Sequence, residues 1–229
     1  MIRLAAIRRG AILGLLLFAA TFLGASEVLD GIAVAVNGHV ILRSDWQDEV
    51  RYEFFVAAKP LQGITLEDRK GALDRLIDQE LLREQTGTSE VRPASPEEIE
   101  KQYEIVKADY GRDHGALTWS AVLVSYHLTE ADIKNHIALE LSQLRLVDAH
   151  FRPSIQVDAA AIADYYRDHM APHPAGGQRI SLKEATPKIR ELLTQEKMNQ
   201  LLGPWLESLR SQAQIKIFAA DSPETQGQQ

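Results

Sequence analysis

Histidine spacing is the first place to look for chemistry in this sequence of 229 residues, which contains no cysteine. His169 and His173 have the i, i+4 spacing of a metal-binding pair on one helix face. Pro172 lies between them and disrupts the helix that would align their rings, and the sequence offers no third ligand nearby. We therefore expect no metal site. The other histidines are interpreted as surface or internally satisfied side chains: His39, His114, His127, His136 and His150.

Nucleophile and phosphate-binding motifs are also missing from the sequence. Ser181-Leu182-Lys183 places its lysine one position too early for a Ser-x-x-Lys motif, and there is no G-x-S-x-G elbow. Gly176-Gly177 follows a predicted helix rather than a strand, unlike a phosphate-binding loop. The acidic pairs Asp48-Glu49 and Glu97-Glu98 fall in the first turns of predicted helices, where they favour the helix dipole. The sequence thus predicts no catalytic residue, no cofactor and no enzyme activity.

The first residues have the pattern of an export signal. Three arginines precede or begin an apolar run over residues 10–23, which ends in small residues at Ala25 and Ser26. This pattern predicts a signal peptide over residues 1–26, cleaved after one of these two positions. A membrane span needs about 20 apolar residues, so the run is short for a retained anchor, which is the alternative. We expect an exported protein with no stable membrane insertion after cleavage.

The net charge of the exported chain excludes some classes of binding partner. The formal net charge is −7, and removing the leader removes three arginines and no acid, giving 22 − 32 = −10. Nucleic acids and anionic membrane surfaces require cationic patches, so neither is an expected partner. Without cysteine there is also no disulfide framework. Packing alone must stabilise the fold.

The segment 31–56 carries the clearest structural signals. Ile32–Val36 and His39–Arg43 alternate like strands on either side of Asn37-Gly38, which predicts a hairpin because both residues tolerate positive φ. Ser44 is expected to cap the following helix together with Gln47.

Helices account for most of the remaining chain. Their apolar spacing predicts helices over 65–85, 96–110, 129–151 and 159–170, with Gly87 and Gly111 ending the first two. Leu117–Leu128 fits either a strand or a short helix, and its setting between helices favours the helix. Thr186-Pro187 is expected to open the last helix, and Gly203-Pro204 to kink or break it.

A short strand closes the sequence at Ile215–Phe218. A lone hairpin is marginally stable in water, so the N-terminal hairpin needs a further strand or a helical cover. The closing strand is the best candidate partner. Pairing within one chain or in a swapped dimer would satisfy this need equally well, and the oligomeric state stays open.

Taken in order, five segments resemble the SurA N-terminal domain family of periplasmic chaperones. These segments are 32–46, 72–85, 96–103, 157–169 and 181–218. Trigger-factor-like chaperone domains are the nearest alternative. The resemblance implies a mainly α fold with a small β element, in which the N-terminal hairpin pairs with the C-terminal strand.

The resemblance also implies a domain organisation. Residues 27–172 would form the SurA-like helical domain with its hairpin, and 186–218 would complete it with a helix and a strand. In the family, one or two parvulin-type prolyl isomerase domains stand between these parts. Here only a linker over 173–185 remains, whereas a folded domain without disulfides or metal needs at least about 40 residues. Residues 219–229 are expected to be a disordered tail.

The function implied by this resemblance is that of an ATP-independent holdase. Such a chaperone binds unfolded outer-membrane or secreted polypeptides through apolar surface, without a catalytic step. A prolyl isomerase and a dedicated envelope assembly or scaffold protein are the alternatives. The candidate client-binding side chains are aromatic: Phe54, Phe55, Tyr103, Tyr110, Trp119 and Tyr126.

Overall fold

Helices dominate the computed structural model, which describes residues 30–87, 91–114, 118–170 and 180–218. The expected signal peptide, most of the expected linker and the expected tail lie outside these residues. In chain order the elements are β1 (Ile32–Val36), β2 (His39–Leu42), α1 (Arg43–Val56), η1 (Leu61–Gly63), α2 (Leu66–Gly87), α3 (Pro96–His114), α4 (Trp119–Ser125), α5 (Glu130–Phe151), η2 (Arg152–Ser154), α6 (Ala159–Tyr165), η3 (Tyr166–Met170), α7 (Leu182–Gln212) and β3 (Ile215–Ile217).

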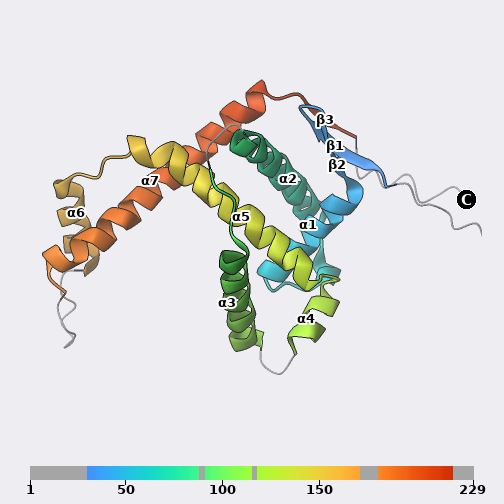
Figure 1. Cartoon of the computed structure of the whole chain (residues 1–229), viewed down its shortest axis with the longest axis horizontal. Coiled ribbons are helices and arrows are strands. Elements are labelled where there is room, and N and C mark those ends of the chain that lie inside the picture. Colours follow the sequence, from blue (N-terminus) through green and yellow to red (C-terminus); the bar gives the residue numbers. More distant parts are fainter. Residues whose placement is uncertain (1–29, 88–90, 115–117, 171–179, 219–229) are drawn as a thin grey trace, which may run out of the picture. The chain divides into compact units, whose positions relative to one another are not determined.

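The three strands form one antiparallel sheet in the order β2-β1-β3. Asn37 and Gly38 take φ values of 48° and 90° in the turn between β1 and β2, as the hairpin prediction requires. Val34 pairs with Ile217, and Val36 with Ile215. The predicted pairing of the hairpin with the C-terminal strand is therefore confirmed, and it occurs within one chain (Figure 1).

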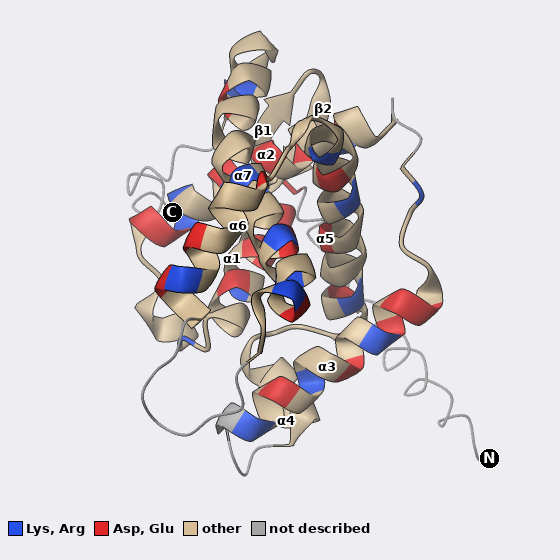
Figure 2. Cartoon of the chain, turned by 90° about the vertical axis from the view of Figure 1, so that its left-hand side faces the viewer, with Lys and Arg blue, Asp and Glu red and all other residues tan. Residues whose placement is uncertain are grey.

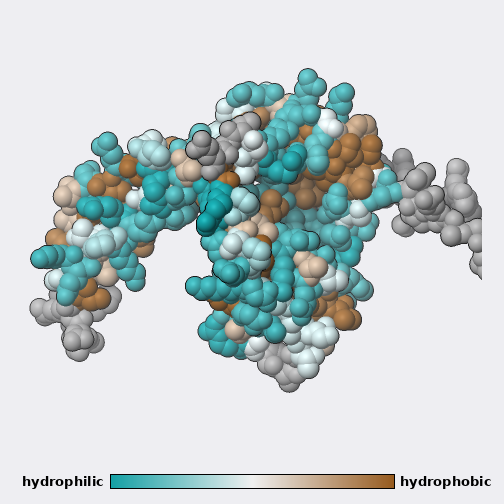
Figure 3. Space-filling model, viewed as in Figure 1, coloured by the Kyte–Doolittle hydropathy of each residue, from teal (hydrophilic) through white to brown (hydrophobic). Residues whose placement is uncertain are grey.

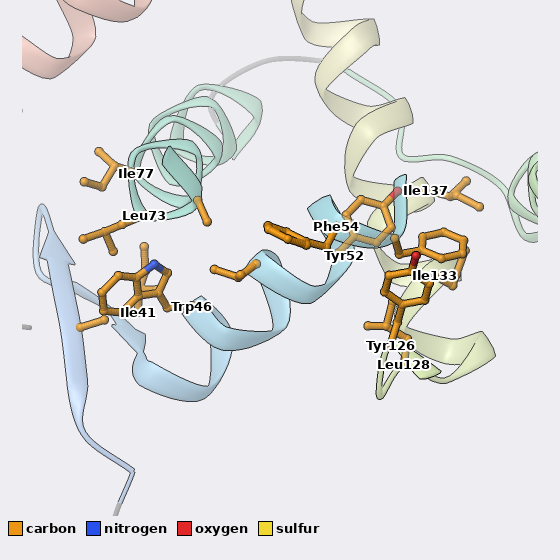
Figure 4. Close-up of a cluster of buried hydrophobic side chains, with 14 of the residues drawn as sticks. Ile41, Trp46, Tyr52, Phe54, Leu73, Ile77, Tyr126, Leu128, Ile133 and Ile137 are labelled. Atoms are coloured by element: carbon orange, nitrogen blue, oxygen red, sulfur yellow. The ribbon is translucent and has the colours of Figure 1, made fainter. Parts of the chain in front are cut away.

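Helix α1 begins two residues earlier than expected and has a different cap. The N–H of Leu42 donates to the Asp45 carboxylate at 2.9 Å, so the predicted Ser44–Gln47 capping box is wrong. From this start, Ile41 and Trp46 face Leu73 and Ile77 of α2 (Figure 4). The Trp46 indole N–H donates to the carbonyl oxygen of Arg69 at 2.7 Å. The hairpin and the first two helices are thereby joined in one core.

Helix α7 differs most from the sequence prediction. It begins at Leu182, capped by Ser181, rather than at Thr186, so the end of the expected linker is helical. It also continues through Gly203-Pro204 to Gln212, so the predicted break is wrong. Pro204 and Gln200 are both exposed, so water can bind the carbonyl that the proline leaves free. Met198 and Trp205 pack into one apolar cluster with Phe151, which stabilises the helix on both sides of the proline.

The end of α7 is tied to α2 by Arg210. Its guanidinium donates to the Asp78 carboxylate at 2.6 Å, and to the carboxylate and carbonyl oxygens of Asp74 at 3.2 and 2.7 Å. These bonds join residues more than 130 positions apart and place the following strand β3 beside β1. The last helix is therefore an integral part of the body that contains the hairpin.

The remaining helices follow the predicted pattern with small differences at their ends. α3 continues past Gly111 to His114, so that glycine does not end it. The ambiguous segment forms the helix α4. The segment predicted as 159–170 is helical throughout, but its last turn, Tyr166–Met170, is a π-helix. No helix in the described residues has the length and hydrophobicity needed to cross a membrane.

Candidate functional site

The six predicted client-binding aromatics lie in or against the core rather than on an exposed surface. Tyr103, Phe55, Phe54 and Tyr126 are buried, with exposed fractions of 1%, 2%, 4% and 8%. Tyr110 and Trp119 are partly buried against them. The expectation that these side chains offer apolar surface to a client is thus corrected: four of the six are covered by the protein itself.

Five of these residues form an aromatic cluster: Phe55, Tyr103, Tyr110, Trp119 and Tyr126. Phe55 stacks on Tyr110 with ring centroids 5.1 Å apart and meets Trp119 and Tyr126 edge-on. The Trp119 indole donates to the Tyr103 hydroxyl oxygen at 2.6 Å, and the hydroxyls of Tyr110 and Tyr126 lie 3.3 Å apart. Burial raises the pKa of Tyr103 to about 12, so its hydroxyl stays neutral. The cluster therefore joins α1, α3 and α4 structurally.

Exposed apolar surface occurs instead on the outer face of the sheet. Val34, Val36 and Ile41 point to the inner face and are buried at 0%, 0% and 6%. Directly paired residues lie on the same face of a sheet, and residues next to each other along a strand lie on opposite faces. The bulge between Ile32 and Val34 shifts this alternation, so that Ile32 lies on the outer face. The members of this outer face are Ile32, Ala35, Val40, Leu42, Lys216 and, just after β3, Phe218.

The outer face is open and mostly apolar, with Lys216 at its β3 side. Ile32, Val40 and Phe218 are 40%, 41% and 54% exposed. Hydrophobic residues gather over the sheet in Figure 3, and strands β1 and β2 carry no charged side chain (Figure 2). A sheet with one solvated face normally alternates apolar and polar residues. Here the outer face is apolar except for Lys216 on β3, and an exposed apolar surface of this kind is typical of a face that another polypeptide covers.

Strand β3 also leaves one edge of this sheet unpaired within the described residues. The N–H of Asn37 donates to the carbonyl of Gln214, and the N–H of Phe218 to that of Ala33, both at 2.9 Å. Since partners alternate along an antiparallel ladder, Ile215 and Ile217 direct their N–H and C=O groups away from β1. The edge therefore offers backbone donors and acceptors beside the apolar outer face.

The hairpin turn is fixed to its neighbours by polar contacts. The Asn37 side chain donates to the Glu84 carboxylate of α2 at 2.7 Å and accepts from the N–H of Gln214 at 2.8 Å. Nearby, Glu80 is 6% exposed and is held by two hydrogen bonds from Arg83. The turn, α2 and the start of β3 are thus joined, so the sheet is presented as a preorganised surface.

A second candidate site is a cavity of about 400 Å³ between α1, α2 and α5, here called the acidic cavity. It is lined by carboxylates of Glu49, Glu53, Asp68 and Glu140, together with Tyr52, Phe54, Val56, Ala57, Lys59, Arg75, Gln79, His136 and Leu139. Glu49 was expected to lie in the first turn of a helix. Instead it lies a turn further along α1 and is only 3% exposed.

Three of the described histidines pack against aromatic rings. His136 stacks on Tyr52, His150 on Trp205, and His169 lies against Tyr165. His173 is outside the described residues. No group of three or more His, Cys, Asp or Glu side chains in the described ranges is arranged to hold a metal ion.

No protein-family model and no characterised protein matches the sequence.

Proposed function

We propose that this protein is an ATP-independent holdase of the SurA type, which binds extended apolar segments of unfolded exported polypeptides in the periplasm. The observation that carries this proposal is the exposed apolar outer face of the sheet beside the unpaired edge of β3. Binding requires no catalytic step.

An extended polypeptide is the occupant that suits both features. A strand added next to β3 would accept and donate hydrogen bonds at Ile215 and Ile217, whose backbone groups face outward. Alternate side chains of the added strand would then lie on the same face as Val40 and Phe218. An unfolded chain can offer an extended segment anywhere along its length, whereas a folded partner offers only the exposed edges of its own sheets, so the edge favours unfolded chains.

The expected affinity is moderate, as a holdase needs. Burial of apolar surface contributes roughly 25 cal/mol per Å², and ordering the client segment opposes it. Weak, reversible binding keeps the unfolded chain from aggregating by mass action. The net charge of −7 keeps the chaperone itself soluble while its apolar face is open.

Aggregation of a urea-unfolded outer-membrane β-barrel protein, followed by light scattering after dilution, tests the proposal. The wild-type protein should suppress scattering at near-equimolar ratios, and V40K should lose most of this effect because it adds a charge among the apolar side chains of the outer face, which in the wild type carries only that of Lys216 at its β3 side. V124K is the matched control, since Val124 is 69% exposed on α4, away from the sheet. Equal activity of V40K and V124K would refute the role of the sheet.

The backbone edge needs its own pair of variants. I217P removes an outward N–H without removing a bond to β1, whereas I217A removes the side chain and keeps the N–H. Stronger loss in I217P supports strand addition. A stable dimer through the same edge, seen by light scattering on a sizing column, or a single stoichiometric partner in pull-downs, would contradict the holdase and favour a self-association or scaffold role. Acceleration of prolyl cis–trans exchange would contradict the absence of catalysis.

A further inference from the structure

The acidic cavity contains a buried carboxylate that the protein only partly satisfies. Glu49 Oε1 accepts from the Gln79 side chain at 3.2 Å, but within the described residues Oε2 has no hydrogen-bond partner. Nδ1 of His136 lies 3.8 Å from Oε2, which is beyond hydrogen-bonding distance. Buried polar atoms without a partner are rare in folded proteins, and each one points to strain or to a missing ligand.

Within the described residues, no cationic side chain donates a hydrogen bond to Glu49 Oε2. Arg75 is the nearest guanidinium, and it is paired with Glu53. The Lys59 ammonium lies over the Phe54 ring, 6.0 Å from its centroid. The carboxylates of Glu53, Asp68 and Glu140 therefore face the cavity with only two cationic side chains among its lining residues.

An adjoining hollow extends the negative charge. It shares Glu49, Gln79, His136 and Leu139 with the acidic cavity and is otherwise lined by Asp45, Asp48, Leu76, Asp132 and Asn135. Asp48 pairs with Arg51, and the Asp45 and Asp132 carboxylates accept hydrogen bonds at helix starts. Carboxylates therefore outnumber cationic side chains in the lining of the two hollows, which favours a positive ligand.

An aromatic wall forms one side of the acidic cavity. The rings of Tyr52 and His136 stack in parallel, with centroids 3.6 Å apart and an interplanar angle of 4°. The Tyr52 hydroxyl donates to Glu140 at 2.9 Å, which fixes that carboxylate at the entrance. Val56 and Leu139 add apolar lining.

From this geometry we propose that the acidic cavity binds one organic monocation, a guanidinium or a primary ammonium on an aliphatic stem, with the carboxylate of Glu49 as its buried acceptor. The cavity of about 400 Å³ has room for an arginine or lysine side chain. The stem would lie along Val56 and Leu139, and the head group would meet Glu49 and Glu140. This site lies apart from the sheet and does not depend on the proposed holdase function.

Binding should be coupled to a proton. Burial, together with the charge of Glu53, raises the pKa of Glu49 to about 7, while Arg75 and the Gln79 amide act in the opposite direction. Burial lowers the pKa of His136 to about 4 against the charge of Asp132, so its ring is neutral near pH 7. Tyr52 and Glu140 complete the facing groups. A cation requires the ionised form of Glu49, so its affinity should rise between pH 6 and pH 8.

Isothermal titration calorimetry with three probes tests the site. N-acetyl-arginine amide represents a peptide side chain, n-butylammonium chloride a free amine, and N-acetyl-norleucine amide is the neutral control. We expect a cation to bind and the neutral probe not to bind, with E49Q weakening the cation at least ten-fold. Which of the two cations binds more tightly distinguishes a peptide side chain from a free amine as the source of the ligand.

Two further variants make the result decisive. E207Q is the matched control because Glu207 is exposed on α7, outside the cavity. E49Q keeps the acceptor for Gln79 and should fold, which thermal unfolding checks. Equal binding of the cationic and neutral probes, or unchanged affinity in E49Q, would overturn the proposal. V40K should bind the cations normally, so failure of the holdase function and failure of this site can be told apart.

Discussion

Helix α1 contributes to two buried regions that treat their polar atoms in opposite ways. In the aromatic cluster, the indole of Trp119 and the hydroxyl of Tyr103 bond to each other at 2.6 Å around the apolar ring of Phe55. In the acidic cavity, Glu49 leaves an oxygen without a partner in the described residues. The polar atoms of the aromatic cluster satisfy one another without any ligand, whereas the acidic cavity contains a buried oxygen that has no hydrogen-bond donor. The comparison separates side chains that build the fold from side chains placed to bind.

The largest loss of stability is expected from a substitution in the aromatic cluster. Phe55 is 2% exposed and contacts three aromatic rings, so F55A leaves a cavity that its neighbours cannot fill. We expect a loss of about 3–5 kcal/mol in the free energy of unfolding, measured by urea denaturation. V124A, at a 69% exposed position, should change it by less than about 0.5 kcal/mol. A similarly small effect of F55A would show that the cluster does not support the fold.

The acidic cavity should respond to pH through Glu49. Its pKa is raised from 4.5 to about 7, so its stabilising contribution is complete below about pH 4.5 and is lost as the pH rises through about 7. E49Q removes this loss. Its stability relative to the wild type should therefore increase by about 3 kcal/mol between pH 4.5 and pH 7.5, measured by urea unfolding at each pH. Parallel pH curves for E49Q and wild type would contradict the burial of an ionisable group here.

The contribution of His136 to the free energy of unfolding should change with pH in the opposite direction. Its pKa is lowered from 6.5 to about 4, so its contribution is present above pH 6.5 and is lost as the pH falls through about 4. H136F keeps a ring against Tyr52 and cannot be protonated. Relative to wild type it should gain about 2 kcal/mol as the pH falls from 6.5 to 4, less than for Glu49 because 18% of the His136 side chain is exposed.

The control for this prediction is H150F, in the same urea series. His150 also stacks on an aromatic ring, that of Trp205, but it lies on an exposed position of α5. Its replacement should leave the pH dependence near that of the wild type. If H136F and H150F respond alike, the histidine at the acidic cavity is no different from a surface histidine.

The sequence predicted those parts of the fold that depend on local signals or on strand pairing. Asn37-Gly38 specifies its turn through two residues, and the unpaired hairpin pointed to Ile215–Phe218 as its partner. The proline prediction for α7 was wrong because it considered the helix alone. Tertiary contacts of Met198 and Trp205, and the access of water at Gln200, decide that the helix continues.

The candidate sites were beyond the reach of sequence alone. Alternation in β1 shows that a strand has two faces, but the bulge at Ala33 and the pairing with β3 decide which residues stay open. Glu49 meets Gln79 and His136 only because three helices converge on it. Its spacing of three residues from Trp46 was a weak signal that it lies beside a buried stripe. Aromatics at helical spacing were a better signal for core than for client contacts, as the burial of Tyr103 shows.

The smallest effects compare two tyrosine hydroxyls, one in each region. Y103F removes the acceptor of a partly buried indole N–H, which then loses its partner, so we expect a loss of about 1–2 kcal/mol in the free energy of unfolding. Y52F removes a donor to Glu140, which is exposed and can bind water instead, so about 0.5 kcal/mol is expected. Cation affinity should follow the reverse order, because Y52F releases the carboxylate at the cavity entrance whereas Y103F does not touch it. Urea unfolding measures the loss of stability, and calorimetry measures the loss of cation affinity, in the same two variants. If one variant loses more of both, the two regions are not separate.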